Sequence, residues 1–228
     1  MNEAANIDLR IAQPPQTLRE LAVERLRQAI ITGTFKGGDR LIERSLCDQM
    51  GVSRSVIREA VRYLEAEGLV EQRARGGPIV APMDWPRARQ IYDIRILLEA
   101  EAAAKCAETA TAETKKSLKE ALSDLKAAIP AKVDADRLEA TTRFYEVMFS
   151  AAGHDIAWEI VNRLNSRISL LRAMTLHSEN RSITGPKHME KICAAICANA
   201  SSAAADAVRA HLTDAAQVAE TLLQDAAP

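Results

Sequence analysis

The sequence predicts a mainly α-helical protein in two parts, and three observations support this fold class. Residues 41–80 have the pattern of two short helices joined by a tight turn and followed by a small β-hairpin. Residues 81–86 contain two prolines, which marks a junction between domains. From residue 87 onward helical periodicity continues without strand-like alternation. We therefore expect an N-terminal helix-turn-helix with a hairpin and a C-terminal all-α antiparallel helical bundle.

The residues around the tight turn predict where its second helix begins and ends. Ser53 follows Gly51-Val52 and is a good N-cap, because its hydroxyl can accept a hydrogen bond from a free amide of the first turn. Gly68 is expected just after the end of the helix, because glycine tolerates the left-handed conformation found there. The buried face is predicted from three apolar residues at helical spacing, Ile57, Val61 and Leu64.

A stripe of arginines follows another face of this helix. Arg54, Arg58 and Arg62 are four residues apart, and Ser53 and Ser55 add hydroxyl groups near the helix start. Guanidinium groups can bind phosphates or donate two hydrogen bonds to guanine in the DNA major groove. Taken alone, such a stripe is more often a solvated charged face. Its place in a helix-turn-helix, directly before a hairpin, favours DNA binding.

The first eighty residues are predicted to contain an arm, three helices and the hairpin. Residues 1–16 are polar, end in two prolines and are expected to form a mobile N-terminal arm. Thr17 and Glu20 form a capping box that opens the first helix. The hairpin is predicted from strands at 69–72 and 78–80, joined by a turn at 74–77.

Residues 17–83 resemble the winged helix-turn-helix domain of the GntR family of bacterial transcription regulators. The matching runs are Gly38-Asp39-Arg40-Leu41, Gly51-Val52-Ser53-Arg54-Ser55-x-x-Arg58-Glu59-Ala60 and Leu64-Glu65-Ala66-Glu67-Gly68-Leu69-Val70. The resemblance implies DNA contacts by five residues, Arg44, Ser53, Arg54, Ser55 and Arg58. It also implies that the wing glycines Gly76 and Gly77 approach the groove, and Arg75 beside them adds positive charge. The wing departs from the family pattern at Ala74, where a polar residue is usual, and at Pro78, which lengthens the tip.

Residues 84–228 are predicted to form the bundle. The expected helices span 87–108, 112–128, 134–152, 155–178, 186–199 and 201–224, with Gly, Pro or Asn punctuation between them. This region resembles the FCD ligand-binding domain of the FadR-type branch of the GntR family over residues 88–224. The resemblance rests on Arg95-x-x-Leu98-Glu99 before an alanine run, Phe144-Tyr145 before Ala151-Ala152-Gly153, and His188 followed by His211.

The resemblance has a departure that concerns metal binding. Many FCD domains hold a divalent metal with an Asp and a His four residues apart, together with two later histidines. Here Thr141 and Tyr145 stand at the first two positions, while His188 and His211 are retained. Two imidazoles alone hold a transition metal weakly, so we expect no required cofactor. The alternative is a divalent metal on His188 and His211, completed by a chelating carboxylate effector.

The effector site is predicted to consist of Arg95, Thr141, Tyr145, His188 and His211. Most of these polar residues lie on otherwise apolar helix faces, which places them inside the bundle. A histidine in such a place is more often a satisfied core residue than a ligand. A buried guanidinium requires an anionic partner, so Arg95 favours a small carboxylate-type effector. Glu99, one turn further on, could instead neutralise Arg95.

These observations predict a ligand-responsive, sequence-specific transcription regulator, with repression relieved by a metabolite as the favoured mode and activation as the alternative. One recognition helix covers few base pairs, so we expect a homodimer, held by the bundle, on a palindromic inverted-repeat operator in double-stranded DNA. Effector binding would reorient the DNA-binding domains through the Pro82–Pro86 junction. The alternative is an enzyme that uses Tyr145, His188 and His211 as acid–base groups, but no phosphate-binding loop or nucleophile elbow accompanies them.

Composition agrees with a cytoplasmic location and no membrane association. The formal net charge is −1, so the positive charge available for DNA must be local. No apolar run is long enough to span a bilayer, and the first residues lack a signal-peptide pattern.

Overall fold

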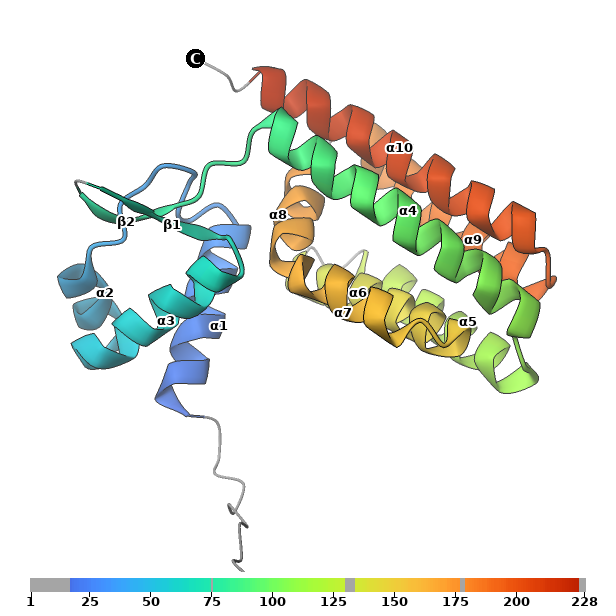
Figure 1. The fold of residues 1–228 in the computed structure, drawn as a ribbon, viewed down its shortest axis with the longest axis horizontal. Helices are drawn as coiled ribbons and strands as arrows, with labels where there is room; N and C mark the ends of the chain where they lie inside the picture. The colour runs from blue at the N-terminus through green and yellow to red at the C-terminus, as the bar shows by residue number, and fades with distance from the viewer. Residues whose placement is uncertain (1–16, 75, 130–133, 177–178, 226–228) are drawn as a thin grey trace, which may run out of the picture.

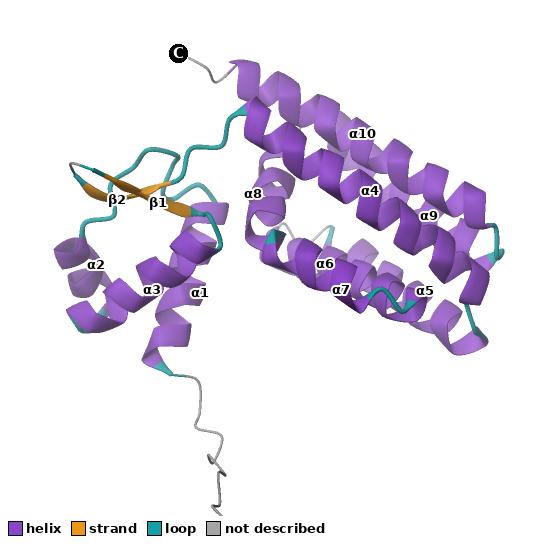
Figure 2. Ribbon diagram, in the orientation of Figure 1, coloured by secondary structure: helices purple, strands orange, loops and turns teal. Residues whose placement is uncertain are grey.

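The computed structural model describes residues 17–74, 76–129, 134–176 and 179–225. The predicted N-terminal arm, residues 1–16, and the predicted DNA contact Arg75 both lie outside these ranges. Figure 1 shows a small N-terminal part beside a larger bundle of helices. Secondary structure is helical apart from one hairpin, as Figure 2 shows, which confirms the predicted fold class.

The N-terminal part is a helix-turn-helix with a wing. Its elements are α1 (Leu18–Ile31), α2 (Glu43–Met50), α3 (Arg54–Ala66), β1 (Val70–Arg73) and β2 (Gly77–Val80). The two strands pair antiparallel, with Val70 opposite Val80. The three helices pack around a core that includes Leu26, Leu46 and Leu64, so the first helix supports the pair that forms the turn.

The predicted turn chemistry is present at both ends of α3. Gly51 ends α2 with φ +66°, and the Ser53 hydroxyl accepts a hydrogen bond from the Val56 amide. The predicted buried face, Ile57, Val61 and Leu64, is confirmed. After α3 the chain passes through Gly68 at φ +73° and enters the hairpin. The residues at the ends and on the buried face of α3 therefore determine which of its faces is exposed to solvent.

The bundle contains the remaining helices. They are α4 (Trp85–Thr109), α5 (Ala112–Ala128), α6 (Asp134–Ala152), α7 (Asp155–Arg163), α8 (Asn165–Leu176), α9 (Glu179–Cys197) and α10 (Ser201–Asp225). The two long helices α4 and α10 lie side by side, and alanines on both permit their close approach (Figure 1). None of the helices within the described ranges is long and apolar enough to cross a membrane.

Two predicted helix boundaries in the bundle are wrong. The segment 155–178 is not one helix, because the chain turns at Leu164, whose amide donates to the Val161 carbonyl three residues earlier. This turn contains no glycine or proline, and Asn162 and Asn165, which flank it, do not by themselves predict a break. Helix α9 begins at Glu179, and Pro186 lies inside it. The helix continues through the proline because Met189 and Ile192 pack into the core directly after it.

We expect substitution of Gly51 to destabilise the protein, because φ +66° brings the Cβ of other L-residues close to their own backbone. Gly51→Ala should lower the free energy of unfolding by about 1–2 kcal/mol. Gly51→Asn is the matched control and should lower it less, because Asn adopts this conformation more readily. Urea unfolding followed by circular dichroism measures both. Equal losses for Ala and Asn would contradict the backbone explanation, since no atom lies within 4 Å of the added Cβ.

Candidate DNA-binding surface and ligand cavity

The arginine stripe of α3 is exposed, as a DNA-reading face requires. Arg54, Arg58 and Arg62 are all exposed, and so are Ser53 and Ser55, whose hydroxyls lie 2.8 Å apart. Arg44 on α2 is exposed as well. The helix-turn-helix thus presents basic and hydroxyl groups together on one surface.

Arg58 is oriented by a residue of the preceding helix. Its Nε donates to both carboxylate oxygens of Glu43, at 2.9 and 3.0 Å. This hydrogen bond lowers the pKa of Glu43 and keeps that carboxylate ionised. Since the bonds to Glu43 are made by Nε, they leave the two terminal amino groups of Arg58 for a bidentate contact with a base. Glu43 is a positioning residue that the sequence reasoning missed.

The wing is attached to the rest of the domain by an arginine. Gly76 and Gly77 form its tip with φ +137° and +80°. The Arg40 guanidinium donates to the Gly76 carbonyl from Nε at 3.1 Å and from Nη2 at 2.6 Å. A Cβ on Gly76 would lie 3.3 Å from Arg40 Nη2, so glycine permits this close approach. Arg40 belongs to the run Gly38-Asp39-Arg40-Leu41 that resembles the GntR family, but the sequence did not predict its contact with the wing.

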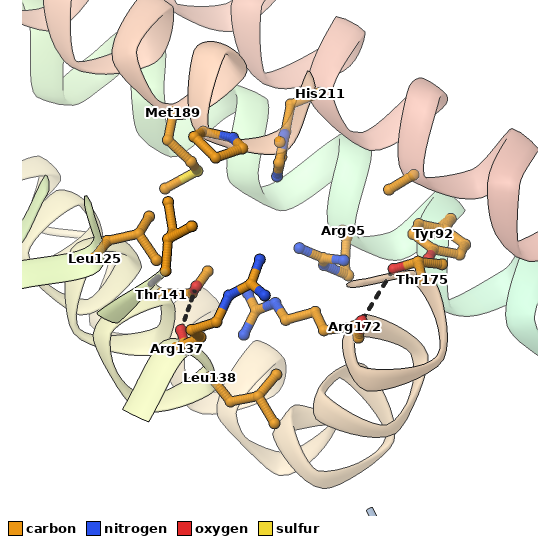
Figure 3. Close-up of a pocket in the computed structure, with 14 residues that line it drawn as sticks. Tyr92, Arg95, Leu125, Arg137, Leu138, Thr141, Arg172, Thr175, Met189 and His211 are labelled. Atoms are coloured by element: carbon orange, nitrogen blue, oxygen red, sulfur yellow. Dashed lines mark hydrogen bonds between the residues drawn. The ribbon is translucent and has the colours of Figure 1, made fainter. Parts of the chain in front are cut away.

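The bundle encloses a cavity of about 60 Å³ whose wall is partly basic. The guanidinium groups of Arg95, Arg137 and Arg172 reach it from α4, α6 and α8, as Figure 3 shows. The imidazole of His211 enters from α10. Leu125 and Met189 contribute apolar wall. The cavity therefore combines three cationic groups with an apolar side.

Arg95 and Glu99 form a buried ion pair on α4. Arg95 Nε lies 2.7 Å from Glu99 Oε1, and the side chains are 2% and 0% exposed. Burial alone would lower the pKa of Arg95, but the Glu99 carboxylate outweighs burial and raises it, so Arg95 stays charged. The guanidinium also lies 5.7 Å from the centre of the Tyr92 ring and 6.0 Å from that of Tyr145. Of the two predicted interpretations of Arg95, neutralisation by Glu99 is the one the structure contains.

Arg137 and Arg172 have no such carboxylate partner. In the described part of the chain, neither makes an ion pair, and the buried Nε of Arg137 has no hydrogen-bond acceptor. Arg172 donates to the Thr142 hydroxyl at 3.3 Å and lies 5.4 Å from the centre of the Tyr145 ring. Burial, followed by repulsion from Arg95, lowers the pKa of Arg172 to about 10. Arg172 is still protonated at neutral pH.

The predicted effector residues are only partly brought together. Arg95, Thr141 and His211 line the cavity. Tyr145 does not line it, because its ring is buried between the guanidiniums of Arg95 and Arg172. Burial and the negative charge of Glu99 raise the pKa of Tyr145, so its hydroxyl remains protonated.

His188 also lies off the cavity wall, at 3.6 Å from the Asp214 carboxylate. Its ring centre is 5.6 Å from that of His211. Over the described ranges, no group of three His, Cys, Asp or Glu side chains is placed to hold a metal ion. Arg137 and Arg172 were missed, although Arg172 follows buried Ile168 at helical spacing, the same signal that identified Arg95.

Helix α8 connects the cavity with the DNA-binding part. Near the start of α8, the Ser166 hydroxyl donates to Oε2 of Glu67 at 2.5 Å. Glu67 directly follows α3. Arg27 of α1 donates to the same carboxylate at 2.6 and 3.0 Å. The Arg167 guanidinium fills the place that a Cβ on Gly68 would occupy. Since Arg172 lies at the other end of this helix, one rigid element contacts both sites.

Leu170 extends this contact by packing against the core of the DNA-binding part. A second apolar contact joins Ile31 of α1 to Leu138 and Ala173 of the bundle. Both Leu138 and Arg172 line the cavity, so residues of its wall adjoin the interface between the two parts. No pattern in the sequence predicts this interface.

Comparison with known families identifies both parts. The family described as bacterial regulatory proteins, gntR family, matches residues 18–80. The FCD domain matches residues 90–214, which is more than half of the chain. The two matches adjoin at the proline-containing junction.

Individual relatives agree. The uncharacterized HTH-type transcriptional regulator YdhC of Bacillus subtilis is 29% identical over 188 residues, 82% of this chain and 84% of that protein. The gluconate operon transcriptional repressor of the same species is 29% identical over 140 residues, 61% of this chain and 57% of that protein.

Solved structures share the fold. A GntR transcriptional regulator from Rhodococcus sp. RHA1 has a TM-score of 0.74 at 23% identity, covering 92% of this chain and 99% of that one. Escherichia coli McbR/YncC has a TM-score of 0.71 at 21% identity over the same shares. At these identities the likeness supports the fold alone.

We expect Arg54→Ala and Arg58→Ala each to weaken specific DNA binding by about 1–3 kcal/mol, because each removes a guanidinium from the groove-facing end of α3. Arg62→Ala is the matched control and should weaken it less, because it lies further along the helix. The measurement is a titration at fixed salt with an operator duplex and a scrambled duplex. If Arg58→Ala left the ratio of the two affinities unchanged, its base-reading role would be wrong.

Proposed function

This chain belongs to the GntR family of bacterial transcription regulators and carries the FCD domain of the FadR-type branch, and on that premise we propose that it is an effector-responsive repressor. It binds an inverted-repeat operator as a homodimer in the cytoplasm and is released by a small organic acid. The observation that carries this proposal is helix α8, which places Arg172 in the cavity wall and Ser166 and Arg167 against the DNA-binding part.

The basic cavity supports an acidic effector. Carboxylates bind guanidinium groups by charge-assisted hydrogen bonds, which are strong where water is excluded. An effector on Arg172 would change the balance of charge at one end of α8. A helix moves as a rigid unit, so a shift there changes the contact with Glu67 and Gly68 at the other end. The result is a change in population between DNA-competent and DNA-incompetent arrangements.

The contact at Glu67 complements the junction at Pro82–Pro86. The junction is the covalent connection between the two parts, whereas α8 provides a non-covalent one. Two connections together restrict how the DNA-binding part can rotate. Loss of the α8 contact would leave the junction and the contact of Ile31 with Leu138 of α6, and the two recognition helices of a dimer would be held less firmly at the spacing that their half-sites require.

Dimerisation is supported by apolar residues that remain exposed on the bundle. Leu97 on α4 is 72% exposed and Ile156 on α7 is 70% exposed. Ile94 and Ile160, on the same two helices, are also exposed. Large apolar side chains on the surface mark interaction sites when they gather together, and α4 and α7 contact each other.

The alternative of an enzyme has less support. It requires Tyr145, His188 and His211 as acid–base groups, but of these three His211 alone lines the cavity. Tyr145 has a raised pKa, which makes its hydroxyl a poor base at neutral pH. The hydroxyl of Thr141, which does line the cavity, donates to the Arg137 carbonyl at 2.7 Å. We therefore propose binding without turnover.

We expect the full-length protein to select an inverted repeat from a library of random DNA duplexes. The half-site centres should be about one helical turn, roughly 10 base pairs, or a multiple of it apart, because the two recognition helices are related by a twofold axis. Arg58→Ala should enrich the repeat less, and Arg62→Ala should resemble the unaltered protein. Enrichment of a site without twofold symmetry would contradict the proposed mode of binding.

We also expect light scattering at micromolar concentration to give twice the chain mass of 24.9 kDa. Leu97→Glu should reduce the measured mass, because it would place a charge in the buried centre of the interface. Ile42→Glu is the matched control, since Ile42 is an exposed apolar residue of the DNA-binding part and should leave the mass unchanged. A monomer before substitution would refute the dimer.

A further inference from the structure

The cavity does not provide what a metal site of the FCD domain requires. Thr141 and Tyr145 replace an Asp and a His, and their hydroxyl groups are poor metal ligands. The Thr141 hydroxyl is already bonded to a backbone carbonyl, and Tyr145 lies off the wall. In the described segments, no three metal-binding side chains gather. The residues present do not fit the metal.

The same cavity is lined by three arginines, Arg95, Arg137 and Arg172. The Arg95 charge is balanced by Glu99 at 2.7 Å. Arg137 and Arg172 are balanced by no carboxylate among the residues that the structure describes. Their guanidiniums point into the same space between helices α6 and α8, as Figure 3 shows. Counted over the described residues that line it, the cavity therefore carries an excess of two positive charges.

An uncompensated guanidinium inside a protein is costly, because its desolvation is not repaid by a partner. The lowered pKa of Arg172 reports this cost, yet the group remains protonated at neutral pH. A structural role would pair each arginine with an acidic residue, as Glu99 pairs with Arg95. Two unpaired guanidiniums on one small cavity indicate instead that a ligand brings the missing negative charges.

We propose that the cavity is a metal-independent site for a compact dianion, held directly by Arg137 and Arg172. Its volume of about 60 Å³ leaves room for only a few water-sized groups, so a short dicarboxylate fits and a long acyl chain does not. Leu125, Ile129 and Met189 provide apolar wall for the carbon atoms between the charged groups. The identification of this dianion as the effector rests on the proposed function; the binding site itself does not.

The first test compares ligands that differ only in charge. Full-length protein dialysed against EDTA is titrated calorimetrically with malonate, succinate, inorganic phosphate and succinamate, which replaces one carboxylate of succinate by an amide. We expect a dianion to bind at least about tenfold more tightly than succinamate. The phosphate arm distinguishes a phosphorylated ligand from a dicarboxylate. Zinc or manganese should leave the affinity unchanged.

The second test removes the two guanidiniums. Arg137→Gln and Arg172→Met should each weaken binding of the best dianion by about 10- to 100-fold. Arg143→Gln is the matched control, because Arg143 is an exposed arginine on the same helix as Arg137 and pairs with Asp124 at 3.0 Å. Without ligand, Arg172→Met should keep or raise the melting temperature, since it removes an unpaired charge. A merely structural arginine would lower the melting temperature when replaced.

Several results would overturn the proposal. They are binding of none of the three dianions, binding only with added metal, equal affinity for succinate and succinamate, and unchanged affinity in both arginine variants. The results that would refute the proposed function differ from those that would refute the binding site. If a dianion binds but operator affinity is unchanged, the site stands and the effector role is refuted. If another class of compound releases the operator and no dianion binds, the function stands and this site is refuted.

Discussion

The bundle interior is built around the buried ion pair between Arg95 and Glu99, which contributes no net charge. Both side chains come from one turn of α4, and both are almost completely buried. Removing either partner would leave a buried charge without compensation, which commonly costs several kcal/mol. Because Arg95 is satisfied within its own helix, its positive charge needs nothing from other parts of the cavity wall. The net charge of the cavity is therefore set by the arginines that other helices add.

Among the described residues that line the cavity, those helices contribute arginines and no acidic side chain. Arg137 comes from α6 and Arg172 from α8, and the ring of Tyr145 lies against Arg172 and Arg95 together. The ring face offers weak stabilisation to both cations but cannot replace a carboxylate. The bundle thus has one internally complete ion pair beside an incomplete set of charges. This contrast is the reason to interpret the cavity as a proposed binding site and not as a packing defect.

The short length of α8 matters as much as its residues. The turn at Leu164 separates it from α7 and gives the two helices different directions (Figure 1). Helix α7 packs against α6, while α8 reaches α1 of the DNA-binding part. A single long helix would have kept one direction. The break is therefore the structural reason that the cavity and the recognition helix share a neighbour.

Local signals explain which parts of this structure could be predicted from the sequence. Ser53 and Gly51 act through their own backbone and first neighbours, so the ends of α2 and α3 were predictable. Arg95 and Glu99 share one helix, and their pairing was foreseen as one of two interpretations. The turn at Leu164 depends on packing between helices, and the asparagines that flank it are too weak a local signal to predict it. The positions of His188 and Tyr145 relative to the cavity depend on how three helices meet, which spacing within one helix cannot reveal.

Gly68 has a consequence for how regulators of this kind can exchange domains. A side chain at this position is opposed twice, by a φ of +73° and by the guanidinium of Arg167. Asn often replaces glycine after a helix, and it would tolerate this backbone conformation but would still collide with Arg167. A DNA-binding part transferred from a related protein with another residue at this position would have to accept the positive φ and displace the Arg167 guanidinium. The compatibility of the DNA-binding part with the bundle therefore depends on the missing Cβ of Gly68, outside the residues predicted to contact DNA.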